Sequence, residues 1–282
     1  MRRAPLFVAF LSACGANGTR SEVPSPGVDA DSGKVAHQRD AGTWIDAQRD
    51  VIENARPGAP LLVTSPATSA SRNGSCPSGM ASIGGGAFKM GELGTIIAVH
   101  AFCLDITEVT SEGYEQCVQS RRCNDEGLQC GAAATYGVAT KRDHPINCVT
   151  WAQADKYCRA QGKRLPKEEE WEWAARGQDQ GFDFPWGNGT SEGKVCWSGG
   201  TRVREGTCRV GEFVAGDAAG GIHDLAGNVW EWTASNYNQR DASRVNKGGG
   251  FISNRKVDLD VSNRYADEPT NRTVYDGFRC AK

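Results

Sequence analysis

The spacing of apolar and polar residues changes near residue 76 of this 282-residue chain. Beyond that point, two short apolar runs at 83–91 and 96–102 predict strands. Apolar residues then recur at helical spacing in three segments: 111–119, 151–161 and 168–176. Thr110 and Thr150 directly precede the first two of these segments. Because a threonine hydroxyl can accept a hydrogen bond from a free backbone N–H, both residues are suited to cap a helix.

Composition and charge narrow the class of protein. Glycine and tryptophan are frequent, at 35 and 8 residues, and this favours a domain of short strands, turns and loops over a helical bundle. The net charge is −2, from 32 Lys and Arg against 34 Asp and Glu, and no block of basic residues stands out. We therefore expect no nucleic-acid partner.

The N-terminal residues have the pattern of an export signal. Two arginines precede a short apolar run at 5–13, and Cys14 follows small residues directly. This pattern predicts a secretory signal peptide over 1–13. The Leu-Ser-Ala-Cys ending resembles a bacterial lipobox, in which Cys14 becomes the lipidated first residue of the mature protein. A plain signal peptide with an incidental cysteine is the alternative, but the apolar run is too short to span a bilayer as a helix.

Residues 14–75 are rich in Ala, Ser, Pro, Gly and Asp. Such a segment buries too little surface to offset its chain entropy, so we predict a disordered tether. The expected protein is exported and held in the bacterial cell envelope by a lipid anchor, with the folded domain over 76–282. Ala16, rather than an aspartate, stands second after the cysteine, which favours the outer membrane over the inner one.

The cysteine count agrees with export. The chain has eleven cysteines, and setting Cys14 aside leaves ten, an even number that can pair completely. An exported chain would oxidise them. No CxxC motif or Cys/His cluster with zinc spacing is present, which argues against a zinc site. The ten are Cys76, Cys103, Cys117, Cys123, Cys130, Cys148, Cys158, Cys196, Cys208 and Cys280.

Several short blocks follow one another in a specific order. They are FKMG at 88–91, DITEVT at 105–110, HPINCVTW at 144–151, GKRLP at 162–166, EWE at 170–172, AARG at 174–177, FPWGN at 184–188, GNVWEW at 227–232, KGG at 247–249 and GFRC at 277–280. Together they resemble the formylglycine-generating-enzyme, or sulfatase-modifying-factor, domain from about residue 76 to the end. The resemblance implies a disulfide-rich α+β fold, a C-type-lectin-like variant with little regular secondary structure.

We expect five disulfides: Cys76–Cys103, Cys117–Cys123, Cys130–Cys148, Cys158–Cys280 and Cys196–Cys208. The resemblance itself places a bridge between the helix of Cys158 and the last strand, at Cys280. The two bridges within 117–148 could be exchanged, so the pairing among those four cysteines stays open.

The resemblance also implies an activity and a metal. Enzymes of the family oxidise a sulfatase cysteine to formylglycine with O₂, and two cysteines between the glycine pair and the final GFRC block bind copper. Thiolates suit Cu(I) because both are soft. Here no cysteine stands between 249 and 277, and the two positions fall near Ser253 and near 256–258. We therefore expect neither copper nor a catalytic residue.

The resemblance also leads us to expect a structural calcium site. The family binds structural calcium around its GNxWEW block, and hard oxygen ligands suit that ion. The matching groups are the carboxylates of Asp224 and Glu231 and the carbonyls of Gly227 and Val229. The alternative, weighed equally, is that Glu231 caps a turn or pairs with an arginine. A second calcium site of the family is lost, because Val195 and Cys196 replace its first ligands.

Aromatic and arginine side chains in these blocks have plain structural interpretations. The tryptophans are expected in the core, because each can bury on the order of 200 Å². The tryptophans expected in the core are Trp171, Trp173, Trp186, Trp230 and Trp232. Arg164 and Arg279 are expected to form structural ion pairs.

Taken together, the sequence favours a lipid-anchored, non-catalytic binding or scaffolding module. Its expected partners are the membrane, through the lipid, and an envelope protein or a glycan. Two alternatives stay open. One is a formylglycine-generating-type oxidase that uses a displaced site. The other is a glycan or peptide binder that uses the loops 187–207 and 236–246.

Overall fold

The structure is a computed structural model that describes residues 75–240 and 242–282. The described residues belong to one compact unit, Ser69–Lys282. The expected signal peptide, the lipidated Cys14 and all but the last residue of the expected tether lie outside the described residues. Within the described part of the chain, no helix is long and apolar enough to cross a membrane.

Short strands form three small sheets in the described residues. β1 (Met80–Ile83) pairs antiparallel with β4 (Phe102–Asp105), and β2 (Gly86–Met90) pairs antiparallel with β3 (Thr95–Val99). The third sheet has the order β7-β6-β5-β8, from Tyr265–Asp267, Arg244–Lys247, Trp230–Asn236 and Asp276–Gly277. Its β5–β8 pair is parallel and the other two pairs are antiparallel.

The two strands predicted at 83–91 and 96–102 are present, but each is interrupted. The first run breaks between β1 and β2, at Gly85, and the second breaks between β3 and β4, after Val99. A Cβ on Gly85 would lie 2.9 Å from the Val99 carbonyl oxygen, so the two breaks approach each other closely only because residue 85 is glycine.

The three predicted helices are confirmed, with their caps. They are α2 (Ser111–Gln119), α3 (Trp151–Ala160) and α4 (Glu168–Ala175). Thr110 accepts a hydrogen bond from the Gly113 N–H, and Thr150 accepts one from the Gln153 N–H. Short 3₁₀ helices connect the rest: η1 (Ala139–Lys141), η2 (Gln178–Gln180), η3 (Val214–Gly216) and η4 (Lys256–Leu259).

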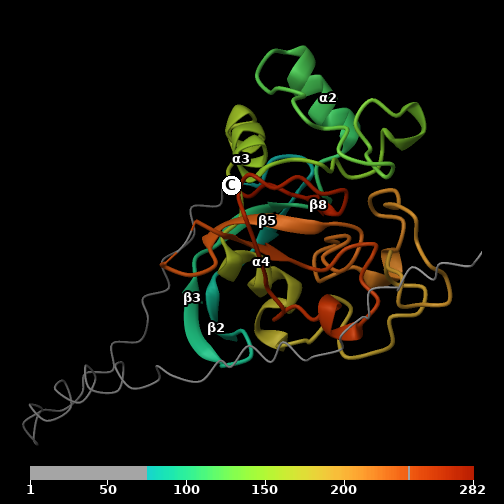
Figure 1. Ribbon diagram of the computed structural model, residues 1–282. Coiled ribbons are helices and arrows are strands. Elements are labelled where there is room, and N and C mark those ends of the chain that lie inside the picture. The colour runs from blue at the N-terminus through green and yellow to red at the C-terminus, as the bar shows by residue number, and fades with distance from the viewer. Residues whose placement is uncertain (1–74, 241) are drawn as a thin grey trace, which may run out of the picture. The chain divides into compact units, whose positions relative to one another are not determined.

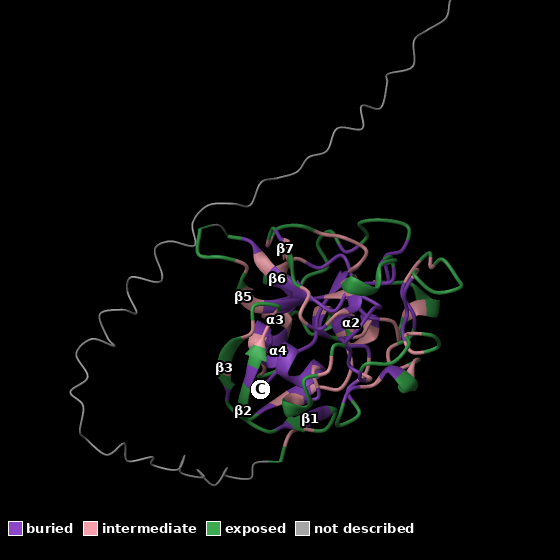
Figure 2. Ribbon diagram, turned by 90° about the horizontal axis from the view of Figure 1, so that it is seen from below, coloured by how far each residue is buried: buried purple, intermediate pink, exposed green. Residues whose placement is uncertain are grey.

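Helices lie on both sides of the four-stranded sheet. Figure 1 shows α3 above β5 and α4 below it. Trp171, from α4, and Trp232, from β5, are fully buried and belong to separate core clusters. Figure 2 shows burial concentrated along α4 and β6, while β3 is largely exposed. Trp173 is also buried as expected, but Trp186 and Trp230 are half-exposed, so the core prediction is correct for three of the five tryptophans.

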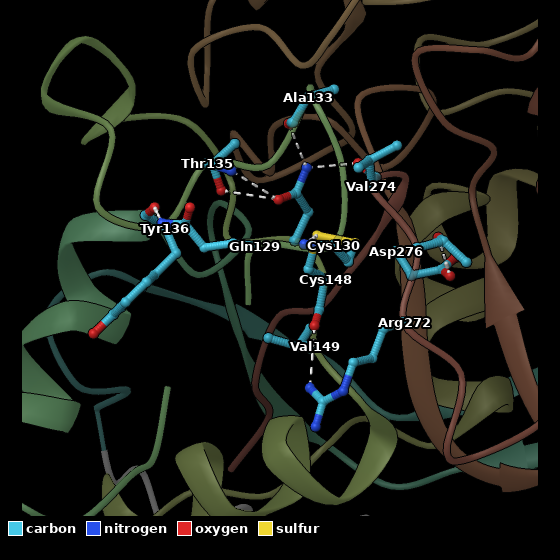
Figure 3. The surroundings of a disulfide bond; sticks show 12 residues. Gln129, Cys130, Ala133, Thr135, Tyr136, Cys148, Val149, Arg272, Val274 and Asp276 are labelled. Atoms are coloured by element: carbon cyan, nitrogen blue, oxygen red, sulfur yellow. Dashed lines mark hydrogen bonds between the residues drawn. A yellow bond between two sulfur atoms is a disulfide. The ribbon is translucent and has the colours of Figure 1, made fainter. Parts of the chain in front are cut away.

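Disulfides tie the loops to this core. The structure pairs the ten cysteines of the described part as Cys76–Cys103, Cys117–Cys123, Cys130–Cys148, Cys158–Cys280 and Cys196–Cys208. These are the pairs listed above, and they settle which arrangement the structure adopts within 117–148. Cys158–Cys280 joins α3 to the end of the chain. Figure 3 shows the Cys130–Cys148 bridge beside Val274 of the segment that leads into β8.

Candidate functional site

The loop that follows β6 holds the two positions at which the resemblance implies copper-binding cysteines. Gly248 and Gly249 both have a positive φ, 96° and 77°. A Cβ on Gly249 would lie 2.7 Å from the carbonyl oxygen of Asp258. The loop can therefore fold back onto η4 only with glycine at this point, which agrees with the close backbone approach that the glycine run suggests.

A cavity of about 320 Å³ opens beside this loop. Ser253 and Asp258 both line it, so the structure brings the first candidate position and one residue of the second, 256–258, to one wall, whereas Lys256 lines another cavity. Trp230 and Tyr265 line it as well, with ring centroids 5.7 Å apart. The half-exposed tryptophan thus belongs to the wall of a cavity, which the sequence pattern did not indicate.

The chemistry of that wall does not suit Cu(I). The Ser253 hydroxyl accepts a hydrogen bond from the Gly250 N–H at 3.1 Å, and the Asp258 carboxylate pairs with Arg255 at 2.7 Å. All ten cysteines of the described residues are in disulfides, so none offers a thiolate. Among these residues no group of three or more His, Cys, Asp or Glu is arranged to hold a metal ion. A hydroxyl and a paired carboxylate are hard ligands and do not fit a soft cation.

Glu231 and Arg279 form a fully buried ion pair. The Arg279 guanidinium donates from Nη2 to Glu231 Oε1 at 2.7 Å and from Nε to Oε2 at 2.8 Å. The Trp171 indole N–H donates to the same Oε2 at 2.8 Å. Arg279 also donates to the His223 carbonyl at 2.8 Å. The structural ion pair expected for Arg279 is therefore confirmed, and Arg164 likewise pairs with Glu170, at 2.6 Å.

Two further carboxylates surround this ion pair. Asp224 accepts a hydrogen bond from the Gly211 N–H at 2.6 Å. Glu108 accepts one from the Asn228 amide at 2.9 Å through Oε1, whereas its buried Oε2 has no partner among the described residues. Burial raises the pKa of Glu108 well above its ordinary value, and the neighbouring Asp224 charge adds to the effect. Burial also raises the pKa of Asp224.

This arrangement bears on the expected calcium ligands. Both Glu231 oxygens are already taken by the guanidinium and the indole, so the carboxylate has no free position for a calcium ion unless Arg279 moves away. The donor set of Asp224, Gly227, Val229 and Glu231 therefore does not fit the ion as the structure has it. The arginine pairing that the sequence left open as an alternative is the one observed.

Asp276 is a buried carboxylate that the sequence reasoning missed. It lines the cavity beside Ser253 and is 2% exposed. The Thr273 hydroxyl donates to Oδ2, and the Asn246 amide donates to Oδ1 at 3.2 Å, but no Lys or Arg of the described residues pairs with it. Burial raises the pKa of Asp276 to about 7, and the nearby Asp267 adds to the increase. Figure 3 shows its place in the final segment, beyond Val274.

The two predicted binding loops line different cavities. Residues from 190 to 204, within the loop 187–207, line a cavity of about 640 Å³ together with Phe213 and Lys256. From the loop 236–246, Tyr237 lines a separate cavity near α4 and the β2–β3 hairpin. The structure therefore does not gather the two loops around a common cavity in its described residues.

Comparisons with known proteins give the chain's relatives. Residues 65–282 match the family described as the sulfatase-modifying factor enzyme 1-like domain. The Bos taurus protein named inactive C-alpha-formylglycine-generating enzyme 2 is 38% identical over 157 residues, which cover 51% of this chain and 52% of that protein. The formylglycine-generating enzyme of Thermomonospora curvata is 31% identical over 175 residues, covering 51% and 57%. The chain thus spans about half the length of these curated relatives.

Solved structures resemble the fold. The structure of PvdO from Pseudomonas aeruginosa superposes with a TM-score of 0.58 at 22% identity, and covers 72% of this chain and 93% of that one. The crystal structure of CarF gives 0.58 at 18% identity, with 73% and 98% covered. At these identities the likeness concerns the fold alone.

Proposed function

The chain belongs to the sulfatase-modifying factor enzyme 1-like domain family, and we propose that it is a member without oxidase activity that acts as a binding or scaffolding module. The single observation that carries the proposal is the wall of the cavity beside β5. There Ser253 and Asp258 form part of the lining, and the resemblance implies two thiolates near 253 and near 256–258.

The chemical reason is the oxidation state of the metal. Oxidation of a cysteine by O₂ in this family requires a metal that can change its oxidation state, and Cu(I) is held there by soft sulfur ligands. In this chain the Ser253 hydroxyl accepts a backbone N–H and the Asp258 carboxylate is paired with Arg255. No free cysteine of the described residues could substitute, because each is in a disulfide.

The relatives also support the proposal that oxidase activity is absent. The Bos taurus relative carries the word inactive in its name and is 38% identical, whereas the Thermomonospora curvata enzyme is 31% identical over a similar length. Loss of activity is therefore compatible with retention of the domain.

We further propose that the domain is displayed at the bacterial envelope on a tether whose Cys14 is lipidated, at the outer membrane rather than the inner one. An exported location agrees with the number of disulfides, which persist in oxidising compartments. Intact-mass measurement of the protein from its native host checks this: we expect a mature chain that begins at Cys14 with acyl groups. A different N-terminus without lipid contradicts it.

A direct assay tests the absence of activity. The disulfide-intact protein is incubated with Cu(I), O₂ and a peptide that contains a sulfatase cysteine motif, and the peptide is analysed by mass spectrometry. The Thermomonospora curvata enzyme is the positive control. We expect no aldehyde product. Product that disappears when the metal is removed would establish the alternative, an oxidase with a displaced site.

A second candidate function is binding of a glycan or a peptide by the loop 187–207. The observation that favours it is the cavity of about 640 Å³ that this loop encloses. Pull-down of the full-length chain from its own cells, compared with a chain whose loop is shortened, separates a loop-dependent ligand from scaffolding by another surface.

A further inference from the structure

The cavity enclosed by the loop 187–207 is built as a fixed feature of the domain. The Cys196–Cys208 disulfide closes its loop at the base. Ser198 anchors it from both sides: its N–H donates to the Ser253 carbonyl at 2.9 Å, and its hydroxyl donates to the Phe251 carbonyl at 2.8 Å. The same hydroxyl accepts the Arg204 N–H at 2.9 Å. The loop is therefore held against the segment that contains Phe251 and Ser253.

The cationic side chains of this cavity lack acidic partners. Arg202, Arg204 and Lys256 line it, against one acidic residue, Glu192. None of the three cations forms an ion pair within the part of the chain that the structure describes. The buried Arg204 Nε has no hydrogen-bond partner there either, and Nη1 contacts only the weak acceptor Cys208 Sγ, at 3.0 Å.

The neighbouring cavity beside Ser253 provides the contrast. Its arginines are both paired, Arg255 with Asp258 at 2.7 Å and Arg264 with Glu168 at 2.8 Å. An unpaired guanidinium donor in a partly buried position is costly, because it has given up water without gaining an acceptor. The excess of positive charge in the larger cavity thus indicates an anionic ligand that supplies the missing acceptors.

The rest of the lining narrows the class of ligand. Trp197 and Phe213 give the cavity aromatic walls, and the Arg204 guanidinium lies 5.3 Å from the Phe213 ring centroid. Thr190 and Thr201 add hydroxyl groups. No β-strand contributes to the lining, so a peptide could not bind there by adding a strand to a sheet edge. Cations, hydroxyls and aromatic walls together suit a sugar that carries a carboxylate.

We propose that this cavity binds an acidic saccharide of about two sugar units, with its carboxylate on Arg204 and Lys256. A volume of about 640 Å³ lies within the range of small-molecule sites. The inference rests on the proposed function in that it takes binding, not oxidation, as the role of the domain, and it deepens that function by naming the ligand class.

Calorimetric titration of the full-length chain with two matched disaccharides tests the proposal. Hyaluronan disaccharide, glucuronate linked to N-acetylglucosamine, is compared with N-acetyllactosamine, which has the same number of rings and no carboxylate. We expect binding of the first and at least tenfold weaker binding of the second. Arg204→Gln and Lys256→Gln should each weaken the acidic disaccharide about tenfold or more, because each removes a charge-assisted hydrogen bond.

Matched controls keep the test interpretable. Lys156→Gln removes an exposed lysine on α3, outside the cavity lining, and should leave affinity unchanged. Each variant's melting temperature is measured so that a folding defect is recognised; because Lys256 is exposed, its variant remains informative if the Arg204 variant fails to fold.

Three outcomes overturn the inference: equal affinity for the two disaccharides, no binding of the acidic one at millimolar concentration, or tighter binding of a hexaglutamate peptide. A failure of this kind leaves the proposed loss of oxidase activity intact. That proposal fails only if the peptide assay above yields aldehyde.

Discussion

The buried frame around Arg279 and the loop around Ser253 differ in how much of the family's design they retain. In the frame, Arg279 binds Glu231 and the backbone of His223, and the adjacent Cys280 is bridged to Cys158. In the loop, Ser253 and a paired Asp258 line a cavity, in the stretch where the resemblance implies copper-binding cysteines near 253 and near 256–258. Side chains that hold the fold are therefore separate from those that would hold the metal.

The comparison shows that the contacts holding the architecture around Arg279 do not depend on the residues of the Ser253 loop. The frame joins segments that are far apart in the sequence, so its removal affects the whole fold. In the loop, the side chains of Ser253 and Asp258 contact only near neighbours in the sequence, Gly250 and Arg255, so these side chains should carry little of the fold's stability. Substitutions that disturb the frame should therefore cost far more stability than substitutions that disturb local or exposed contacts.

The largest effect is expected for the disulfide of the frame. Removing it by C158A/C280A opens a loop with a sequence separation of 122, which in the chain-entropy model costs about 5 kcal/mol. The matched control C117A/C123A opens a separation of 6 and should cost about 2 kcal/mol by the same relation. Urea unfolding of both variants measures the difference. Equal losses would mean that chain entropy does not explain the stabilisation.

The second-largest loss of stability is expected when Arg279 is replaced. Arg279→Met leaves the buried Glu231 without its cation, next to Glu108 and Asp224, and should cost about 3–5 kcal/mol. Arg264→Met is the comparison, because Arg264 pairs with Glu168 while remaining 38% exposed at its side chain; it should cost at most about 1 kcal/mol. Thermal and urea unfolding provide the values. A loss below 1 kcal/mol for Arg279→Met contradicts the frame's role.

A smaller, pH-dependent effect is expected from Asp276, which lines the cavity beside Ser253. Its folded pKa of about 7 lies above the ordinary value of 3.8, so the folded state holds its proton more tightly than the unfolded state. This contribution is complete below about pH 4 and is lost as the pH rises toward 7, at up to about 1.4 kcal/mol per unit.

Asp276→Asn keeps the shape and removes the titration, so the variant should lose less stability than the parent between pH 5 and 7.5. Glu92→Gln, at an exposed position of the β2–β3 hairpin, is the control and should follow the parent. Urea unfolding at the two pH values gives the comparison. Parallel behaviour of Asp276→Asn and the parent would show that Asp276 is ionised throughout this range.

The smallest effect is expected from calcium. Because the Glu231 oxygens already accept hydrogen bonds from Arg279 and Trp171, 5 mM calcium should change the melting temperature by less than about 1 °C relative to EDTA. A site with a dissociation constant of 50 μM would instead add about 2.7 kcal/mol. A rise of several degrees would show that Arg279 yields its place and that the calcium expectation drawn from the resemblance is correct.

Local features of the fold could be predicted from the sequence. The caps at Thr110 and Thr150 follow from neighbouring residues, and the helices match their predicted spans within one residue. The position near Ser253 follows from the order of the family's motifs, and the resemblance also implies the bridge between Cys158 and Cys280. Such features depend on short stretches of chain, or on a motif order that remains recognisable.

The buried charges could not be predicted in the same way. Glu108 lies far from Asp224 and Glu231 in the sequence, and these carboxylates meet only when the chain has folded around Arg279. Asp276 resembles any loop aspartate until the packing of the final segment buries it. The cavity of Arg204 likewise depends on a disulfide and on long-range hydrogen bonds that no local pattern indicates.

Cu(I) affinity tests the central claim most directly. The disulfide-intact parent and the double variant S253C/D258C are titrated with Cu(I) in competition with a chromophoric chelator, with ascorbate as the reductant so that the native disulfides persist. We expect no transfer of copper to the parent and one equivalent bound by the variant, whose two thiolates would line the same cavity. One equivalent of tightly bound copper in the parent, retained with all five disulfides intact, would contradict the claim that this fold has lost its metal site.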